Sequence, residues 1–229
     1  MEKIKVAIVG YGNVGLYSLD AVLQEPDMEL VGIVELISID DIKKSLDARR
    51  CSRFSDLKVV KDIQELGKVD VAIVACPSRA VKHVVSEILK LGINTVDSFD
   101  IHQEIPALRR ELGEIARQYN AVSIISAGWD PGIDSIIRGW LLAMAPKGVT
   151  FTNFGPGMSM GHTCAVKAID GVKNALSITV PAGMGVHRRM VYVELEEGIS
   201  FEEIEKAVKN DPYFIKDITY VFQVDDVKS

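Results

Sequence analysis

The sequence predicts an α/β protein with a doubly wound parallel sheet and a second, smaller α+β domain of split β-α-β type. Three observations predict it. Short, almost wholly apolar runs such as Ile4–Val9 alternate with helical patterns in the first half of the chain. A glycine-rich turn directly follows the first run. From Trp129 onward the order changes to strand, helix, two strands, helix and strand. We therefore expect a Rossmann-type domain at residues 1–128 and a substrate-binding and dimerisation domain at residues 129–229.

The first half is expected to alternate strands and helices, because right-handed crossovers then bring its strands into one parallel sheet. The strands are short apolar runs, and the helices carry apolar residues at helical spacing. The polar stretch Leu36–Ser55 is expected to be an irregular loop or a short helix. The expected helices run from the glycine turn to about Gln24, from Ser78 to Gly92, and from about Ile105 to Tyr119. The expected strands are Ile4–Val9, Leu30–Val34, Val69–Cys76, Asn94–Val96 and Val122–Ser126.

The second half has a different order of elements. A helix at Ile133–Ala145 leads into a small open sheet with helices on one face. The expected elements of this sheet are the strand Val149–Phe154, the helix His162–Ile169, the strands Ala175–Val180 and Arg189–Leu195, the helix Phe201–Lys209 and the strand Ile218–Val224.

The composition excludes several classes of protein. With 48% hydrophobic residues, the chain of 229 residues can bury a substantial core and is too apolar for disorder. Its 26 basic and 32 acidic residues, a net charge of −6, argue against a nucleic-acid or membrane-surface binder. Three scattered cysteines, with no signal peptide or membrane-spanning run, lead us to expect a cytoplasmic protein. No cysteine or histidine spacing predicts a metal site.

Gly10, Gly12 and Gly15 form a G-x-G-x-x-G pattern between the first strand and the first helix. Dinucleotide binding needs Gly10 for a tight turn, Gly12 for approach of the pyrophosphate, and Gly15 for helix–strand packing. The helix N-terminus adds free N–H groups and partial positive charge for the phosphates. This context favours a dinucleotide site over a glycine-rich turn without a ligand.

Glu35 ends the second strand, twenty positions after Gly15. An acid there accepts hydrogen bonds from a ribose 2′-hydroxyl and repels a 2′-phosphate, which favours NAD over NADP. A plain exposed acid at a strand end is the alternative interpretation.

Two further segments follow strands at the carboxyl edge, where open α/β sheets bind ligands. They are Cys76-Pro77-Ser78-Arg79 and Ser98-Phe99-Asp100. Asp100 is either a turn or cap residue or a functional acid, and its position on this edge favours function.

Three later segments are candidates for a ligand cleft. Trp129-Asp130-Pro131-Gly132 has the residues of a helix start, with Asp as the cap and Pro at the first helical position, and a cap residue can also face a cleft. The glycine-rich connection Phe154–His162 is either a turn or a wall of the cleft. One arginine of His187-Arg188-Arg189 could bind a carboxylate through two hydrogen bonds, or both could lie in solvent.

Together these segments resemble the meso-diaminopimelate dehydrogenase family. The resemblance covers nearly the whole chain and is carried by GYGNVG at Gly10–Gly15, DSFDIH at Asp97–His102, SAGWDPG at Ser126–Gly132, FGPGMSMGH at Phe154–His162, and the ITVP and HRR segments. It implies reversible NADP-dependent oxidative deamination at the D-centre of meso-2,6-diaminopimelate, giving L-2-amino-6-oxopimelate and ammonium. It also implies a role in lysine biosynthesis and a homodimer with its interface in the second domain.

The resemblance further implies roles for individual residues. Asp100 and Asp130 hold the reacting amino group, and Trp129 is a neighbouring wall of that site. Thr179 and Arg189 bind the distal L-centre carboxylate, where Arg189 is chosen by the register of the HRR segment. The residues implied beside the substrate are Phe154, Met160 and Gly161. The implied cofactor contacts are Tyr11, Gly12, Asn13, Val14, Cys76, Pro77, Ser78, Arg79, Ser98, Phe99 and Asp100.

The chain differs from the family in two places. Where the family carries an arginine-bearing segment after the second strand, this chain has Val34-Glu35-Leu36-Ile37-Ser38, so NAD is an alternative to NADP. The chain stops at Ser229, before the family's usual end, so we expect it to lack a C-terminal part that supplies a distal-site His and Asn. Two other functions stay open: an NAD-linked dehydrogenase of another small substrate, and a dinucleotide-binding dimer with impaired catalysis.

Overall fold

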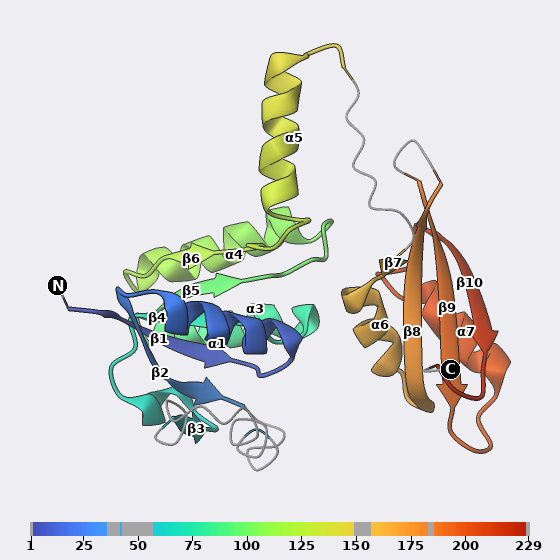
Figure 1. Cartoon of the computed structure of the whole chain (residues 1–229), viewed down its shortest axis with the longest axis horizontal. Coiled ribbons are helices and arrows are strands. Elements are labelled where there is room, and N and C mark those ends of the chain that lie inside the picture. Colours follow the sequence, from blue (N-terminus) through green and yellow to red (C-terminus); the bar gives the residue numbers. More distant parts are fainter. Residues whose placement is uncertain (1, 36–41, 43–56, 149–156, 183–185, 228–229) are drawn as a thin grey trace. The chain divides into compact units, whose positions relative to one another are not determined.

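The computed structural model describes residues 2–35, 42, 57–148, 157–182 and 186–227 (Figure 1). The chain divides into two compact units, Met1–Ile137 and Arg138–Ser229. The division falls inside α5 (Ile133–Met144), and the domain boundary at residue 128 stays a prediction. Within the described ranges, no helix has the length and apolar character needed to cross a membrane.

The first unit is built on a six-stranded sheet in the order β3-β2-β1-β4-β5-β6. All neighbouring strands in it are parallel, as predicted. The strand order changes direction between β1 and β4, which is the point where sheets of this kind bind ligands beyond their carboxyl ends. The strands are β1 (Ile4–Val9), β2 (Met28–Val34), β3 (Lys58–Val60), β4 (Val71–Val74), β5 (Asn94–Asp97) and β6 (Ser123–Ile124).

Helices cover both faces of this sheet. Successive residues of a strand point to opposite sides, so an apolar strand such as β1 contacts helices on each face. Ile8 of β1 packs with Leu19 of α1, whereas Val9 packs in a separate cluster with Val85 of α3 and Leu112 of α4. Figure 1 shows α1 in front of the strands and α3 behind them. β1 is therefore apolar and buried from Val6 to Val9, where both of its faces are covered. The helices are α1 (Asn13–Gln24), α3 (Ser78–Lys90) and α4 (Ile105–Gln118).

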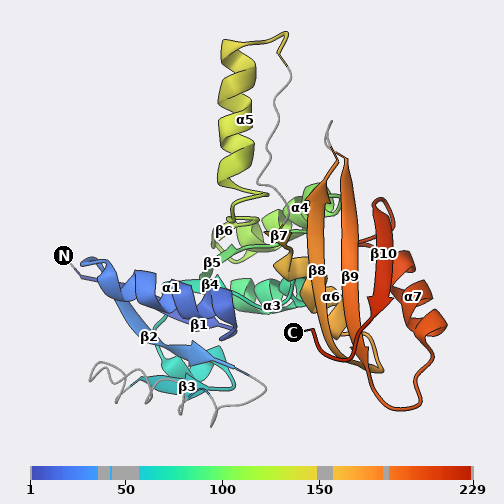
Figure 2. The ribbon, with the colours of Figure 1, turned by 45° about the vertical axis from the view of Figure 1, so that its right-hand side comes forward.

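The second unit has a four-stranded mixed sheet in the order β10-β9-β8-β7 (Figure 2). β8 is antiparallel to β7 and β9, and β10 is parallel to β9. Ala175, Val191 and Val221 of the sheet share one buried cluster with Val166 of α6 and Val208 of α7. Both helices therefore cover the same face, as the sequence predicts. The elements are β7 (Gly157–Met158), α6 (Met160–Lys167), β8 (Val172–Pro181), β9 (His187–Leu195), α7 (Phe201–Asn210) and β10 (Ile218–Gln223).

The predicted fold class is confirmed, while several element bounds differ from the prediction. The predicted strand 122–126 shortens to β6 because Ser126 has a φ of +57°, which a strand residue does not adopt. β3, the 3-10 helix η2 (Ile63–Leu66) and β7 were not predicted, because runs of two to four residues carry little periodicity. The predictions for Leu36–Ser55 (except Ile42) and Val149–Phe154 lie outside the described residues.

Candidate active site

The glycine-rich turn joins β1 to α1 at the carboxyl edge of the sheet. Gly10 has a φ of +93°, and a Cβ there would lie 2.9 Å from the backbone oxygen of Ala75 in the loop after β4. A Cβ on Gly15 would overlap the backbone oxygen of Gly10. A Cβ on Gly12, in contrast, would meet no described atom within 4 Å, so the outer side of the turn is open. This shape fits a dinucleotide pyrophosphate at the N-terminus of α1.

Glu35 is attached to this turn. The backbone N–H of Tyr11 donates a hydrogen bond of 2.9 Å to Oε2 of Glu35. The backbone N–H of Gly10 donates to the carbonyl of Val34, at 2.9 Å, which keeps the end of β2 beside the turn. Glu35 is half-buried, so its carboxylate is a fixed acceptor next to the turn rather than a freely moving surface acid.

Ser78 connects two segments that the sequence placed at the sheet edge. Its Oγ donates a hydrogen bond of 2.6 Å to Oδ1 of Asp100, and the backbone N–H of Asp100 donates back to that Oγ at 3.3 Å. Ser78 is the first residue of α3, in the connection that follows β4, and Asp100 lies in the loop that follows β5. The reciprocal pair fixes the position of the Asp100 carboxylate.

The neighbouring predicted contacts differ in what they can offer a ligand. The side chain of Phe99 is 3% exposed and packs in the core, so only its backbone can face a ligand. Burial raises the pKa of the Cys76 thiol to about 11, with Asp97 and Glu35 adding to the shift, so Cys76 is a neutral thiol near pH 7. Pro77 and Arg79 are exposed at the start of α3.

A closed turn carries Trp129 and Asp130. The N–H of Gly128 donates to the carbonyl of Pro131 at 3.1 Å, and the N–H of Asp134 donates to the carbonyl of Trp129 at 2.9 Å. Gly132 has a φ of +143°, and a Cβ on it would overlap the oxygen of Gly128. Only glycine therefore fits position 132, and the turn presents Trp129, 54% exposed, and Asp130 outward.

The loops of Asp100 and Asp130 adjoin each other. Nε2 of His102 lies 4.0 Å from Oδ1 of Asp130, and both side chains are partly exposed. His102 was not among the predicted site residues, although it follows Asp100 by two positions at the same sheet edge. The first unit thus gathers two carboxylates, an imidazole and the glycine turn at the carboxyl ends of β1, β4, β5 and β6. The described residues contain no group of three or more His, Cys, Asp or Glu that could hold a metal.

A second polar cluster lies wholly within the second unit. Thr179 of β8 pairs with Gly157 of β7 on one side and with Arg189 of β9 on the other. Nη1 of Arg189 donates to Oγ1 of Thr179, and Nε of Arg189 donates to Oδ2 of Asp217 at 2.5 Å. The Arg189 side chain is 12% exposed, whereas Arg188 points to solvent. Asp217 was not predicted, because nothing in the sequence links position 217 to position 189.

His162 of the glycine-rich segment has a structural task. Its Nε2 lies 2.9 Å from the carbonyl of Tyr213, which can only accept, so Nε2 carries the hydrogen and Nδ1 accepts from the Ser159 hydroxyl at 2.7 Å. The ring also packs edge-on against Tyr213 and Phe214. These contacts attach α6 to the segment before β10. Gly161 is the second residue of α6, and Met160 begins that helix. Phe154 lies outside the described residues.

Comparisons with known proteins match both units of the chain. A family model described as "Diaminopimelic acid dehydrogenase C-terminal domain" matches residues 128–227, and one described as "Oxidoreductase family, NAD-binding Rossmann fold" matches residues 4–98. The meso-diaminopimelate D-dehydrogenase of Bacteroides fragilis is 57% identical over 99% of this chain and 73% of its own length. That of Ureibacillus thermosphaericus is 34% identical over 93% of this chain and 69% of its own length.

Solved structures show the same similarity. The diaminopimelate dehydrogenase of C. glutamicum in complex with diaminopimelate superposes with a TM-score of 0.79 at 30% identity, covering 98% of this chain and 72% of that chain. An engineered D-amino acid dehydrogenase bound to NADP+ superposes with a TM-score of 0.78 at 26% identity, covering 99% of this chain and 73% of that chain.

Proposed function

Because the chain belongs to the meso-diaminopimelate dehydrogenase family, we propose that it catalyses the reversible oxidative deamination of meso-2,6-diaminopimelate at the D-centre. The products are L-2-amino-6-oxopimelate and ammonium. The observation that carries the proposal is the pair of adjoining carboxylate loops, those of Asp100 and Asp130, on the same sheet edge as the glycine turn. We also propose a cytoplasmic location and a role in lysine biosynthesis, as the family resemblance implies.

The reaction divides into tasks that named residues can perform. A nicotinamide dinucleotide bound here would supply the acceptor for the hydride of the D-carbon. The Gly10–Gly15 turn and the N-terminus of α1 would hold its pyrophosphate. Asp100, fixed by Ser78, and Asp130 bind the ammonium and orient the C–H bond.

Charge and proton transfer fall to the same two loops. The carboxylates of Asp100 and Asp130 stabilise the positive charge of the iminium that forms when the hydride leaves. The ammonium must first lose a proton, and Asp130 with His102 at 4.0 Å forms an exposed pair that can receive it. Water then adds to the imine carbon, ammonia leaves, and the carbonyl product remains.

Arg189 and Thr179 are proposed to bind the distal carboxylate of the substrate, and this assignment gives a sharp test. Arg189→Lys keeps the charge but loses the planar fork of donors. We expect KM for meso-diaminopimelate to rise at least about tenfold with kcat nearly unchanged, because uniform binding is lost far from the reacting carbon. The control is Arg110→Lys at an exposed arginine of α4, for which steady-state kinetics should show no change. Equal effects of the two substitutions would contradict the assignment.

The choice of cofactor is proposed to depend on Glu35. The family resemblance implies NADP, but a carboxylate held against the turn repels a 2′-phosphate and accepts from a ribose 2′-hydroxyl. We therefore propose NAD as the preferred cofactor of this chain. Glu35→Gln removes the charge and keeps an acceptor for the Tyr11 N–H, so it isolates the electrostatic contribution.

The expected result for Glu35→Gln is a rise of at least about tenfold in the ratio of NADP to NAD specificity, equivalent to ~1.4 kcal/mol. The ratio is obtained from kcat/KM for each cofactor, or from each Kd by fluorescence titration. Glu29→Gln, an exposed acid on the same strand, is the control and should leave the ratio unchanged. An unchanged ratio in Glu35→Gln would overturn the role of this carboxylate.

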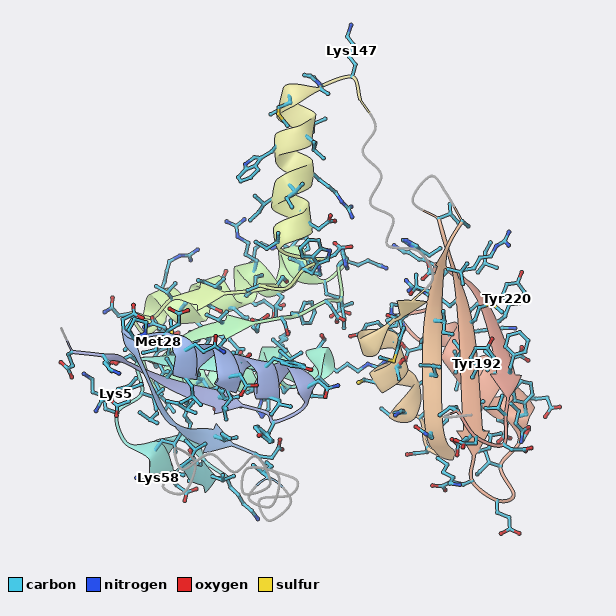
Figure 3. All side chains as sticks on the ribbon, in the orientation of Figure 1. Lys5, Met28, Lys58, Lys147, Tyr192 and Tyr220 are labelled. Atoms are coloured by element: carbon cyan, nitrogen blue, oxygen red, sulfur yellow. The ribbon has the colours of Figure 1, made fainter. Side chains whose placement is uncertain are left out.

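A homodimer is proposed from the outer face of the sheet in the second unit. Leu176, Met190 and Tyr192 alternate with the residues buried against the helices, so they lie on the opposite face. Tyr220 and Phe222 extend this face across β10, at 46% and 39% exposed, and Phe222 stacks on Tyr192. Figure 3 labels Tyr192 and Tyr220 on their two strands. An apolar sheet face of this kind supports pairing with a second copy.

The experiment that tests the proposed function follows reduced nicotinamide formation with meso-diaminopimelate and NAD or NADP, side by side. The LL-isomer, which has no D-centre, is the control substrate. Turnover with the meso isomer and none with the LL-isomer is expected. Absence of turnover with both cofactors would contradict the proposal, and turnover of other D-amino acids alone would favour a different small substrate. Light scattering on the same sample should give twice the chain mass of 25.1 kDa.

A further inference from the structure

Asp97 is a buried acid to which the proposed mechanism gives no task. It is the last residue of β5, and only 2% of it is exposed. Its Oδ1 accepts two hydrogen bonds, from the backbone N–H of Phe99 at 3.0 Å and from that of Ser126 at 3.1 Å. Its own carbonyl accepts a third, from the N–H of Ala127 at 2.7 Å. One residue therefore bonds two stretches of chain almost thirty positions apart.

These three N–H groups belong to the starts of the two loops that carry Asp100 and Asp130. Phe99 directly precedes Asp100, and Ser126 and Ala127 lead into the turn Gly128–Gly132. β5 and β6 pair through two residue pairs only, so their strand pairing ends at Val96 and Ile124, before the two loops begin. Asp97 supplies the connection that the strand pairing lacks.

The backbone at Ser126 shows why such a connection is needed. Ser126 has a φ of +57°, the left-handed region, which a residue other than glycine adopts at a cost. It is 8% exposed, and its Oγ has no partner among the described residues. The hydrogen bonds from Ser126 and Ala127 to Asp97 hold this conformation in place, and the conformation turns the chain from β6 toward Asp130.

The surroundings of the second carboxylate oxygen of Asp97 indicate that the side chain positions the loops and that this task needs no negative charge. Oδ2 is buried and has no hydrogen-bond partner among the residues described. Burial is the main cause that raises the pKa of the carboxyl, against the two backbone donors, which lower it. The loops need one acceptor oxygen from this side chain, and a neutral group of the same shape can supply it.

We propose that Asp97 is a positioning residue whose single acceptor oxygen holds the loops of Asp100 and Asp130 together, so that both acids take their places as one unit. The kinetic consequence rests on the proposed function. The coupling of the two loops does not, because it concerns only contacts within the first unit.

The test compares Asp97→Asn, which keeps the acceptor, with Asp97→Ala, which removes it. The control is Thr95→Val, since Thr95 is also buried on β5 but bonds Ser123 rather than either loop. Amide hydrogen exchange is followed by NMR at Phe99 and Ser126. In Asp97→Ala both rates are expected to rise at least about tenfold, with Asp97→Asn and Thr95→Val close to the parent. If Asp97→Ala does not fold, Asp97→Leu replaces it, because leucine is close to aspartate in shape and has no acceptor oxygen.

A rise at only one of the two amides, or at neither, would overturn the proposal. Kinetics add an independent readout in a double-mutant cycle. Asp97→Ala should lower kcat at least about tenfold in the parent and much less in Asp130→Asn, because its effect acts through that acid. Asp97→Asn should restore kcat. If the parent shows no turnover, the proposed function fails, whereas the exchange rates still decide whether Asp97 couples the loops.

Discussion

Asp130→Asn is expected to lower kcat/KM for meso-diaminopimelate about 10²-fold to 10³-fold, and Asp100→Asn to do the same. The substitution keeps the size of the side chain and removes the negative charge that we propose to face the substrate ammonium and the iminium formed from it. For Asp100 the amide oxygen can still accept from the Ser78 hydroxyl, so the loop keeps its anchor. The loss is therefore expected in the chemical step and not in folding.

The measurement pairs initial rates with thermal unfolding of each variant. The melting temperature should stay within a few degrees of the parent, because neither carboxylate is buried in the core. Asp27→Asn, an exposed acid in the turn before β2, serves as the matched control and should retain full activity. Unchanged activity in both Asp100→Asn and Asp130→Asn would remove the two acids from the site.

The fold could be predicted from the sequence because its strongest patterns are local. β1 is apolar at every position that two covered faces demand, and the glycine turn follows it within one residue. The helices α3 and α4 keep apolar residues at helical spacing over three turns, so they were predicted within one or two residues. Short pieces such as β3 offer no such period, because their strand state depends on pairing with β2.

The candidate site was predictable in its positions but not in its contacts. The position of Asp100 after a strand identified the ligand edge, yet nothing in the sequence links it to Ser78, which lies 22 residues earlier. The role of Asp97 could not be predicted for a similar reason, because the two backbone groups that donate to it, those of Phe99 and Ser126, come from different loops. Long-range pairs of this kind depend on the order of strands in the sheet. They can be predicted only once β4, β5 and β6 are known to be neighbours.

Gly12→Ala and Gly15→Ala are expected to weaken dinucleotide binding for different physical reasons. Gly15 packs against the backbone oxygen of Gly10, so an added Cβ must displace the turn itself. The free protein should lose about 1–3 kcal/mol of stability as well as its cofactor affinity. Gly12 has a φ of −77° and no described atom within 4 Å of its Cβ position, so alanine there should leave the free protein unchanged.

The loss of affinity in Gly12→Ala then reports on the ligand alone. Its methyl group fills the space through which the pyrophosphate approaches the N-terminus of α1, and each lost hydrogen bond to a charged group costs about 1.5–3 kcal/mol. The Kd for the dinucleotide, measured by calorimetry, should therefore rise at least about tenfold. Gly113→Ala in α4, where a Cβ would meet only a side-chain nitrogen of Arg117 at 3.8 Å, is the control and should raise the melting temperature without changing Kd. A Kd for Gly12→Ala equal to that of the parent would mean that the phosphates bind elsewhere, because a ligand held by this turn cannot avoid a methyl group at position 12.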